Sequence, residues 1–258
     1  MTFDRNVFIN CPFDDSYRPL LRPLLFTVYC LGFQPRIALE SRDSGRPRID
    51  KIVELIHESK YAIHDLSRIQ ATSVGEFFRL NMPFELGVDF GCRTFKPGRW
   101  ARKRCLILGY ERFHYQAALS DISGSDIQVH GGKPEKVVRE VRSWLNSHSS
   151  KHTAGPTKIW TDFHTFTEDT HNELISQGHS EDDLKNLEID ELMTRMAAWL
   201  TPAPARESSP NPTRRTRRRL RSAGRSASPD RRAHRCQLRK RSVRTQPPAP
   251  HRLGVPAR

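Results

Sequence analysis

The sequence predicts an α/β fold of the flavodoxin-like type, a doubly wound parallel sheet of about five strands. Short apolar runs alternate with longer amphipathic segments over the first 150 residues, and this alternation is typical of βαβ units. The strongest apolar runs are continuous, which indicates strands buried on both faces. No stretch reaches 18 consecutive apolar residues, so a transmembrane helix is not expected.

The first strand and the first helix are predicted close to the N-terminus. Residues 6–11 (NVFINC) form a short apolar run closed by Pro12, which suits a buried strand. Residues 14–16 (DDS) offer N-cap side chains for an apolar helix that continues through Leu31 and ends at Gly32.

The second and third strands are predicted at 34–40 and 61–66. The polar loop at 41–47 separates the second strand from a helix. One face of this helix is apolar and consists of Ile49, Ile52, Val53 and Ile56.

A third helix begins near Asn81 and continues through MPFELGVDFG, where Gly87 and Gly91 predict close packing against the sheet. Residues 103–110 form a fourth strand of the buried kind, and 125–130 form a weaker fifth. The last helix of this domain has a first-turn proline and an apolar face, consisting of Pro134, Val137, Val138, Val141, Trp144 and Leu145.

A helical appendage at 157–200 is expected after the α/β domain at 1–150, with one helix near 160–176 and another near 180–200. The segment is too small to be a robust domain alone. Its apolar residues either close over the α/β domain or meet a partner. They are Trp160, Phe163, Phe166, Leu184, Leu187, Leu192, Met196 and Leu200.

The positive charge of the chain is concentrated in residues 201–258. This segment holds 16 Arg and 1 Lys against Glu207 and Asp230, which leaves residues 1–200 with a net charge of −1. Rich in Pro, Ser and Arg, it is predicted to be disordered. It can bind nucleic acid or acidic partners non-specifically. Translation in an altered reading frame is an alternative origin, because its Arg-to-Lys ratio differs sharply from the 17 to 9 of residues 1–200.

The cysteines show neither a C-x-x-C pair nor a Cys/His cluster at zinc-finger spacing. They are Cys11, Cys30, Cys92, Cys105 and Cys236. A disulfide scaffold and a structural metal are therefore disfavoured, and no metal site is predicted. The N-terminus lacks the long hydrophobic region of a signal peptide, so a cytoplasmic setting without membrane contact is expected.

Ligands in an open doubly wound sheet bind beyond the carboxyl ends of the strands, where the strand order reverses. In the flavodoxin-like order this point lies between strands 1 and 3, and the third helix begins beside it. The residues that this rule selects are Asn10, Cys11, Phe13, Asp14, Asp65, Ser67, Asn81 and Glu85.

Each of these polar residues also has a structural interpretation. Asp14 can cap a helix, Asp65 and Ser67 can form a turn after the strand, and Glu85 can favour the positive end of its helix by roughly 0.3–1 kcal/mol. A strand-end cysteine such as Cys11 is usually a small buried hydrophobe. Surface or structural roles are also favoured for His57, His64, His114 and His130, which accompany no nucleophile signature.

Four short blocks occur in the order and spacing of a TIR-like domain: VFINCPFDDSY, ESRDSGRPRIDKI, YAIHDLSR and MPFELGVDFG. Over about residues 5–145 the chain resembles TIR domains, and the catalytic glutamate of that family falls on Glu85. The pairing of HDLS with a downstream FELG also resembles nucleoside deoxyribosyltransferase-like proteins. In that comparison, the two acids that line the sugar pocket fall on Asp65 and Glu85.

The resemblance implies an N-glycosidase that acts on NAD or a related nucleotide as substrate, with no cofactor. Because the reaction passes through an oxocarbenium-like centre, Glu85 would stabilise the charge, hold ribose hydroxyls or attack as a nucleophile. Asp65 would orient the sugar or transfer a proton, Asn10 would contact the ligand, and Phe13 or Phe84 would stack on a base. A role in bacterial defence and a homo-oligomeric active state are further implications.

Departures from the family favour an alternative. Met82, Pro83 and Phe84 precede Glu85, where a catalytic TIR helix often carries an aromatic residue and a cysteine. The segment 68–80 is longer than a compact TIR domain needs, and neither a G-x-G-x-x-G nor a Walker motif is present. The alternative is a non-catalytic TIR-like module for nucleotide sensing or protein interaction, in which Glu85 holds a ribose without cleaving it.

Overall fold

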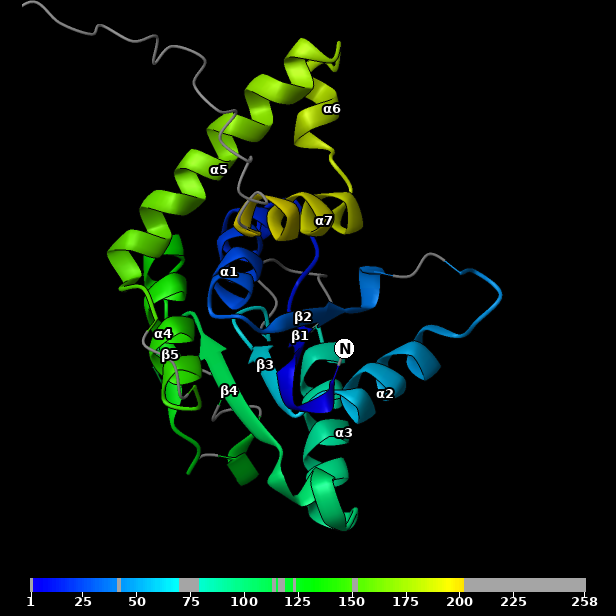
Figure 1. Ribbon diagram of the computed structural model, residues 1–258. Coiled ribbons are helices and arrows are strands. Elements are labelled where there is room, and N and C mark those ends of the chain that lie inside the picture. The colour runs from blue at the N-terminus through cyan, green and yellow to red at the C-terminus, as the bar shows by residue number, and fades with distance from the viewer. Residues whose placement is uncertain are drawn as a thin grey trace, which may run out of the picture. The chain divides into compact units, whose positions relative to one another are not determined.

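The predicted flavodoxin-like sheet is confirmed. The computed structural model describes residues 2–40, 43–69, 79–112, 115, 119–122, 124–149 and 153–201. Five parallel strands form one sheet in the order β2-β1-β3-β4-β5 (Figure 1). The strands are β1 (Asn6–Asn10), β2 (Gln34–Ile37), β3 (Tyr61–Asp65), β4 (Arg104–Gly109) and β5 (Ile127–Val129).

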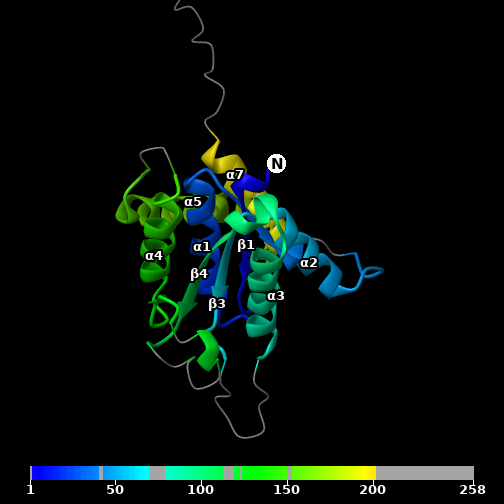
Figure 2. The same ribbon diagram turned by 90° about the horizontal axis from the view of Figure 1, so that it is seen from below.

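Helices cover both faces of the sheet, with α1 and α4 on one face and α2 and α3 on the other (Figure 2). Three further helices follow the last strand–helix unit. The helices are α1 (Arg18–Cys30), α2 (Arg48–Glu58), α3 (Asn81–Phe95), α4 (Pro134–Asn146), α5 (Pro156–Ser176), α6 (Glu181–Lys185) and α7 (Ile189–Leu200).

Successive residues of a strand point to opposite faces of the sheet, so each central strand contributes to two cores. Ile9 and Ile63 belong to the core that includes α1 and α4. Phe8 belongs to the core on the face of α2. The same alternation sends the neighbours His64 and Asp65 to opposite faces, which matters for the site described below.

The two edge strands of the sheet are also its shortest strands. β2 has four residues and includes Pro35, which pairs with Val7 of β1. β5 has three residues and pairs with β4.

The predicted capping of the first helix by residues 14–16 is wrong. α1 begins at Arg18, and its N-cap residue, Tyr17, forms no side-chain capping hydrogen bond. The carbonyl of Asp14 accepts a hydrogen bond from the Tyr17 N–H in a turn that precedes the helix. The Asp14 carboxylate is instead bound by arginines, which a prediction from local sequence does not include.

Two predicted faces also differ from the structure. In α2, Ile49 and Val53 are exposed, because the stripe that meets the sheet consists of Ile52, Leu55 and Ile56. In α3, a Cβ atom added at Gly87 would meet no atom within 4 Å, and one at Gly91 would meet only Phe95 of the same helix. Neither glycine packs closely against the sheet, and the buried residues of α3 are Met82, Glu85, Leu86 and Asp89.

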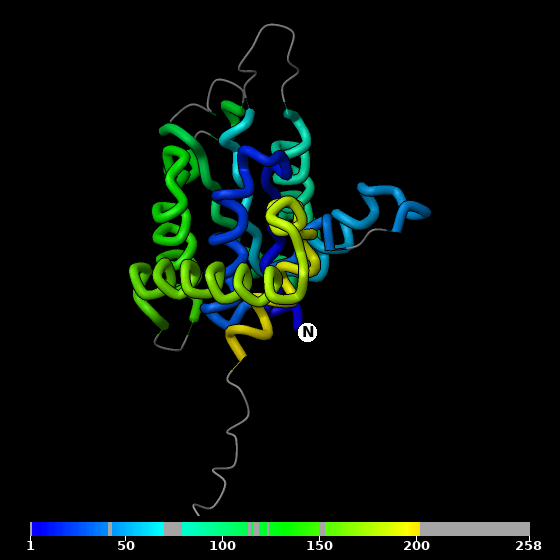
Figure 3. The backbone as a smooth tube through the Cα atoms, turned by 90° about the horizontal axis from the view of Figure 1, so that it is seen from above, coloured from blue at the N-terminus to red at the C-terminus, as the bar shows by residue number. Residues whose placement is uncertain are grey.

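The C-terminal helices close over the α/β domain. The Phe26 ring of α1 lies 5.6, 5.4 and 5.8 Å from the rings of Phe163, Phe166 and Trp199. α5 crosses α1 and α4 (Figure 3). One compact unit therefore includes the α/β domain and the appendage.

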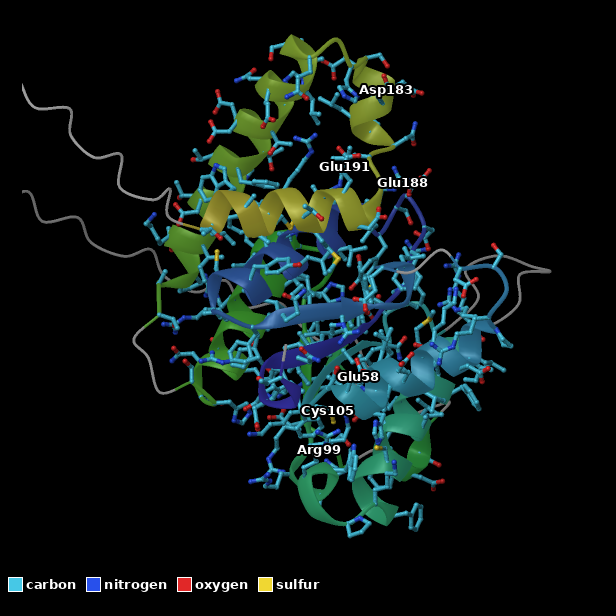
Figure 4. The ribbon with its side chains drawn as sticks, turned by 45° about the vertical axis from the view of Figure 1, so that its right-hand side comes forward. Glu58, Arg99, Cys105, Asp183, Glu188 and Glu191 are labelled. Carbon is cyan, nitrogen blue, oxygen red and sulfur yellow. The ribbon has the colours of Figure 1, made fainter. Side chains whose placement is uncertain are left out.

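The single helix predicted near 180–200 is two helices. A capping box of Ser180 and Asp183 begins α6, on which Figure 4 labels Asp183. α6 ends at Lys185, whose carbonyl accepts hydrogen bonds from Arg18 (2.6 Å) and Arg22 (3.2 Å) of α1. A cationic partner at a helix C-terminus satisfies a carbonyl that the helix itself leaves open, so α1 stabilises the break.

Within the described residues, no helix is long and apolar enough to span a bilayer. The predicted disordered tail lies outside the described residues from position 202 onward, as does His114.

Candidate functional site

The carboxyl edge of β1 and β3 gathers the predicted acids around Cys11. Asn10, the last residue of β1, pairs in register with His64 of β3, and Asp65 ends β3. Burial raises the pKa of the Cys11 thiol well above its usual 9.0, and the charges of Asp65, Glu85 and Asp14 raise it further. The structure therefore brings these three carboxylates to one place and keeps Cys11 as a protonated thiol.

Asp65 lies at this edge as a fully buried carboxylate with three polar partners. Its Oδ2 accepts a hydrogen bond from the Tyr17 hydroxyl at 2.5 Å and lies 3.1 Å from Nε2 of His130. Its Oδ1 accepts a hydrogen bond from the Ser67 N–H at 2.8 Å, as in the predicted turn. Nδ1 of His130 accepts a hydrogen bond from the Gly132 N–H, so the proton of the neutral ring lies on Nε2, facing Asp65.

The partners of Asp65 decide its ionisation. Burial raises the pKa of this carboxyl, but the contact with His130 and the hydrogen bonds from the Ser67 N–H and the Tyr17 hydroxyl outweigh burial and bring the pKa below its usual 3.8. Asp65 is therefore a fixed negative charge at neutral pH.

Glu85 lies on α3 with few partners. Its side chain is 5% exposed, and within the described part of the chain its one ion pair is with Arg48, whose Nη2 lies 3.8 Å from Oε1. Burial raises the pKa of Glu85 from 4.5 to about 7, and the Arg48 charge lowers it only in part. Glu85 is thus present in both the acid and the carboxylate forms near neutral pH.

Three partly exposed arginines lie beside acids of this edge, Arg48 beside Glu85 and the other two beside Asp14. Arg79 and Arg68 lie 2.7 and 3.7 Å from the Asp14 carboxylate, and Arg68 also donates to Ser16. Arg48 lies over the Phe13 ring, 5.5 Å from its centroid. Guanidinium groups donate in a planar fork that matches carboxylate and phosphate groups, and here Arg68 and Arg79 are paired with the Asp14 carboxylate.

The other predicted ligand residues divide into buried and exposed positions. Asn10 is buried, and its amide donates to the Met82 carbonyl and contacts His64. Asn81 and Phe84 lie on the exposed side of α3, where the Phe84 side chain is accessible. Contact of these residues with a ligand stays a prediction.

A second buried polar cluster lies on the opposite face of β3 from Asp65. Nε2 of His64 lies 3.3 Å from Oδ2 of Asp89, whose Oδ1 lies 2.9 Å from the Lys103 ammonium. Lys103 also donates to the carbonyls of Ile56, at 2.7 Å, and Ser59. The rings of His64 and His130, for which surface or structural roles were predicted, both lie in the interior, and each faces a carboxylate.

Sequence reasoning did not select Tyr17, Arg48, Asp89 or Lys103. One signal was present: Asp89 follows Glu85 by four residues, a spacing that places both acids on one face of a helix. Tyr17 and Lys103 carry no comparable signal, since their partners lie on other elements, 48 residues away for Tyr17 and 14 to 47 residues away for Lys103.

Comparisons of the chain with protein-family models, curated proteins and solved structures find no match. The resemblance to TIR and deoxyribosyltransferase-like domains therefore rests on the four sequence blocks, and the candidate site rests on the geometry of Asp65, Glu85 and the surrounding arginines.

Proposed function

We propose that this chain is an N-glycosidase that hydrolyses the N-glycosidic bond of NAD or a related nucleotide, with Glu85 as the functional carboxylate. The observation that supports this most is the state of Glu85: a nearly buried acid at the ligand-binding edge of the sheet, with a pKa of about 7. An acid whose pKa lies near the operating pH accepts and returns protons most effectively.

The chemistry needs one negative charge beside the sugar. When the bond between ribose C1′ and the pyridinium nitrogen of NAD breaks, its electron pair goes to nitrogen and nicotinamide leaves neutral. Positive charge then develops on the ribosyl group, where the Glu85 carboxylate stabilises it. Water forms the new bond to C1′ and gives one proton to Glu85, which later releases it to solvent. The products are nicotinamide, ADP-ribose and a proton.

The arginines and Asp65 have supporting roles in this proposal. Arg48, Arg68 and Arg79 bind the phosphates, because each keeps part of its side chain exposed beside Glu85 or Asp14. Asp65, which is fully buried, holds Tyr17 and His130 in place and acts on the sugar through them.

Nicotinamide release from NAD tests the proposal, with the full chain at high protein concentration and with a crowding agent. We expect release by the wild type and its loss in Glu85→Gln, with an unchanged circular dichroism spectrum. Glu135→Gln is the matched control, because Glu135 also lies in the first part of a helix, is exposed and is remote in sequence. Equal release by wild type and Glu85→Gln would overturn the role of Glu85.

A non-catalytic nucleotide sensor is the second candidate. It is favoured by the burial of Asn10 and Asp65, whose polar atoms bind other parts of the chain. Glu85 is then the acid with fewer partners within the chain. Calorimetric titration with NAD separates the two functions. Binding that Glu85→Gln weakens, without nicotinamide release by the wild type, would establish the sensor in place of the enzyme.

A further inference from the structure

We infer that His64 is a positioning residue for Glu85: it fixes the Asn10 amide, and through Asn10 it holds the first turn of α3. The functional meaning of this inference rests on the proposed role of Glu85. The geometry itself consists of buried contacts on the α3 face of the sheet, made by Asn10, His64, Asp89 and Lys103.

The orientation of the Asn10 amide is determined by a backbone carbonyl. Nδ2 of Asn10 lies 2.9 Å from the Met82 oxygen and 3.0 Å from Nδ1 of His64. A carbonyl oxygen only accepts hydrogen bonds, so the amide nitrogen must face Met82, since the flipped amide would place two oxygens together. The same nitrogen therefore donates to His64, and Nδ1 of that ring carries no proton.

The other ring nitrogen of His64, Nε2, carries the proton and faces Asp89 on the opposite side of the ring. With Nδ1 as acceptor, the proton of the neutral ring lies on Nε2, 3.3 Å from Oδ2 of Asp89. The Lys103 ammonium holds the second oxygen of Asp89 at 2.9 Å. The ring of Phe8 packs edge-on against the imidazole, with centroids 6.0 Å apart. The tautomer and the orientation of His64 are thus both specified.

These contacts lie on either side of Glu85 along α3. Met82 precedes Glu85 by three residues and Asp89 follows it by four, and all three are on the buried face of the helix. His64 contacts this face directly at Asp89 and through Asn10 at Met82. Glu85 lies between the two contacts. A shift of this part of α3 would therefore change how deeply the Glu85 side chain is buried.

The two contacts of His64 differ in how far the rest of the chain supports them. Asp89 keeps the Lys103 ammonium if His64 is replaced, whereas the Asn10 amide loses its partner on β3. Two substitutions separate the contacts. In His64→Asn the amide oxygen can take the place of Nδ1 as acceptor, and in His64→Gln the longer amide can reach the place of Nε2 as donor.

The full chain is assayed as wild type, His64→Asn and His64→Gln. We expect His64→Asn to retain most of the nicotinamide release. His64→Gln should lose about 100-fold in kcat with little change in KM, since a displacement on the order of 1 Å has this effect on a positioned group. Each variant lacks one of the two hydrogen bonds of His64, so a structural role alone predicts similar losses from both.

A second measurement does not depend on activity. The Glu85 carboxyl is titrated by carbon-13 NMR in each variant. We expect a pKa of about 7 in the wild type and in His64→Asn, and a shift towards 4.5 in His64→Gln as Glu85 gains solvent. If His64→Gln does not fold, Asn10→Ala replaces it, with the same shift expected.

The same titration gives the outcome that would overturn the inference. Identical Glu85 titration in the wild type and in the folded His64→Gln or Asn10→Ala protein would leave His64 with a structural role only. Equal losses of kcat in the two His64 variants, in proportion to their losses of thermal stability, would also leave His64 with a structural role only. If the wild type neither binds nor cleaves a nucleotide, the proposed function fails, and the titration still decides the role of His64.

Discussion

Asp65 and Glu85 are two buried acids at one edge of the sheet, and they differ in ionisation. Asp65 is 0% exposed and Glu85 is 4% exposed, so burial alone would raise both pKa values. The pKa of Asp65 is nevertheless lowered by three polar partners, whereas that of Glu85 rises to about 7 beside one arginine at 3.8 Å. The number and distance of donors, more than depth, therefore determine which acid keeps its proton.

The difference follows from the face of the sheet that each acid occupies. Asp65 points towards the face of α1 and α4, where the chain before each helix brings Tyr17 and His130. Glu85 approaches the edge on α3, from the other face. Pairs of titratable groups with pKa values moved apart are typical of acid–base sites, because one group stays charged while the other exchanges protons.

The largest stability effect is expected from removing the more strongly bound acid. Asp65→Ala leaves the Tyr17 hydroxyl, the Ser67 N–H and His130 without their partner, which we expect to cost about 3–5 kcal/mol in the free energy of unfolding. Urea unfolding measures this. Tyr17→Phe is the control, which removes one donor and should cost about 1.5–3 kcal/mol. Equal losses in the two variants would contradict the comparison.

The two acids should also give opposite dependences of stability on pH. Glu85 binds its proton up to about pH 7 when folded but only to about 4.5 when unfolded, so unfolding between these values releases a proton. Stability from this group is therefore present below pH 4.5 and falls by up to roughly 3 kcal/mol as the pH rises to 7. The lowered pKa of Asp65 has the reverse effect, because its stabilisation is present above 3.8 and lost at lower pH.

Unfolding of wild type and Glu85→Gln from pH 4.5 to pH 8 isolates the Glu85 contribution. The variant should gain stability relative to the wild type as the pH rises, since glutamine does not ionise. A difference that stays constant over this range would show that Glu85 titrates normally.

The smallest effect is expected from a substitution that changes the stability of α3 and leaves the chemistry of Glu85 unchanged. Gly87→Ala adds a methyl group that meets no atom within 4 Å. We expect a gain of about 0.5–1 kcal/mol in thermal unfolding, because alanine favours the helix over glycine, and unchanged nicotinamide release. A loss of stability or activity would indicate that another surface packs against Gly87.

Much of the fold could be predicted because its signals are local. Short apolar segments that alternate with helical ones predicted all five strands, the fifth more weakly, and the topology rule then selected the edge where Asp65 and Glu85 lie. The break between α6 and α7 could not be predicted, since the arginines that bind the Lys185 carbonyl lie more than 160 residues earlier in the sequence. No glycine or proline marks this break.

The position of the candidate site could be predicted from the sequence, but the ion-pair and hydrogen-bond partners of its residues could not. Asp14 was expected to cap a helix because its local sequence favours capping, yet Arg79, 65 residues later, binds it. The protonation of Glu85 depends on how few donors reach it after folding, which no local pattern contains. The opposite directions of His64 and Asp65, in contrast, follow from the two-residue period of any strand.

The short edge strands limit how copies of this chain can associate. A sheet grows by adding strands where an edge presents a row of unpaired N–H and C=O groups, and long flat edges lead to aggregation. Here one edge has four residues, including Pro35, which has no N–H to donate, and the other edge has three. Polymerisation through backbone pairing is therefore disfavoured at both ends of the sheet, and a specific assembly of this chain would form through the surfaces of its helices.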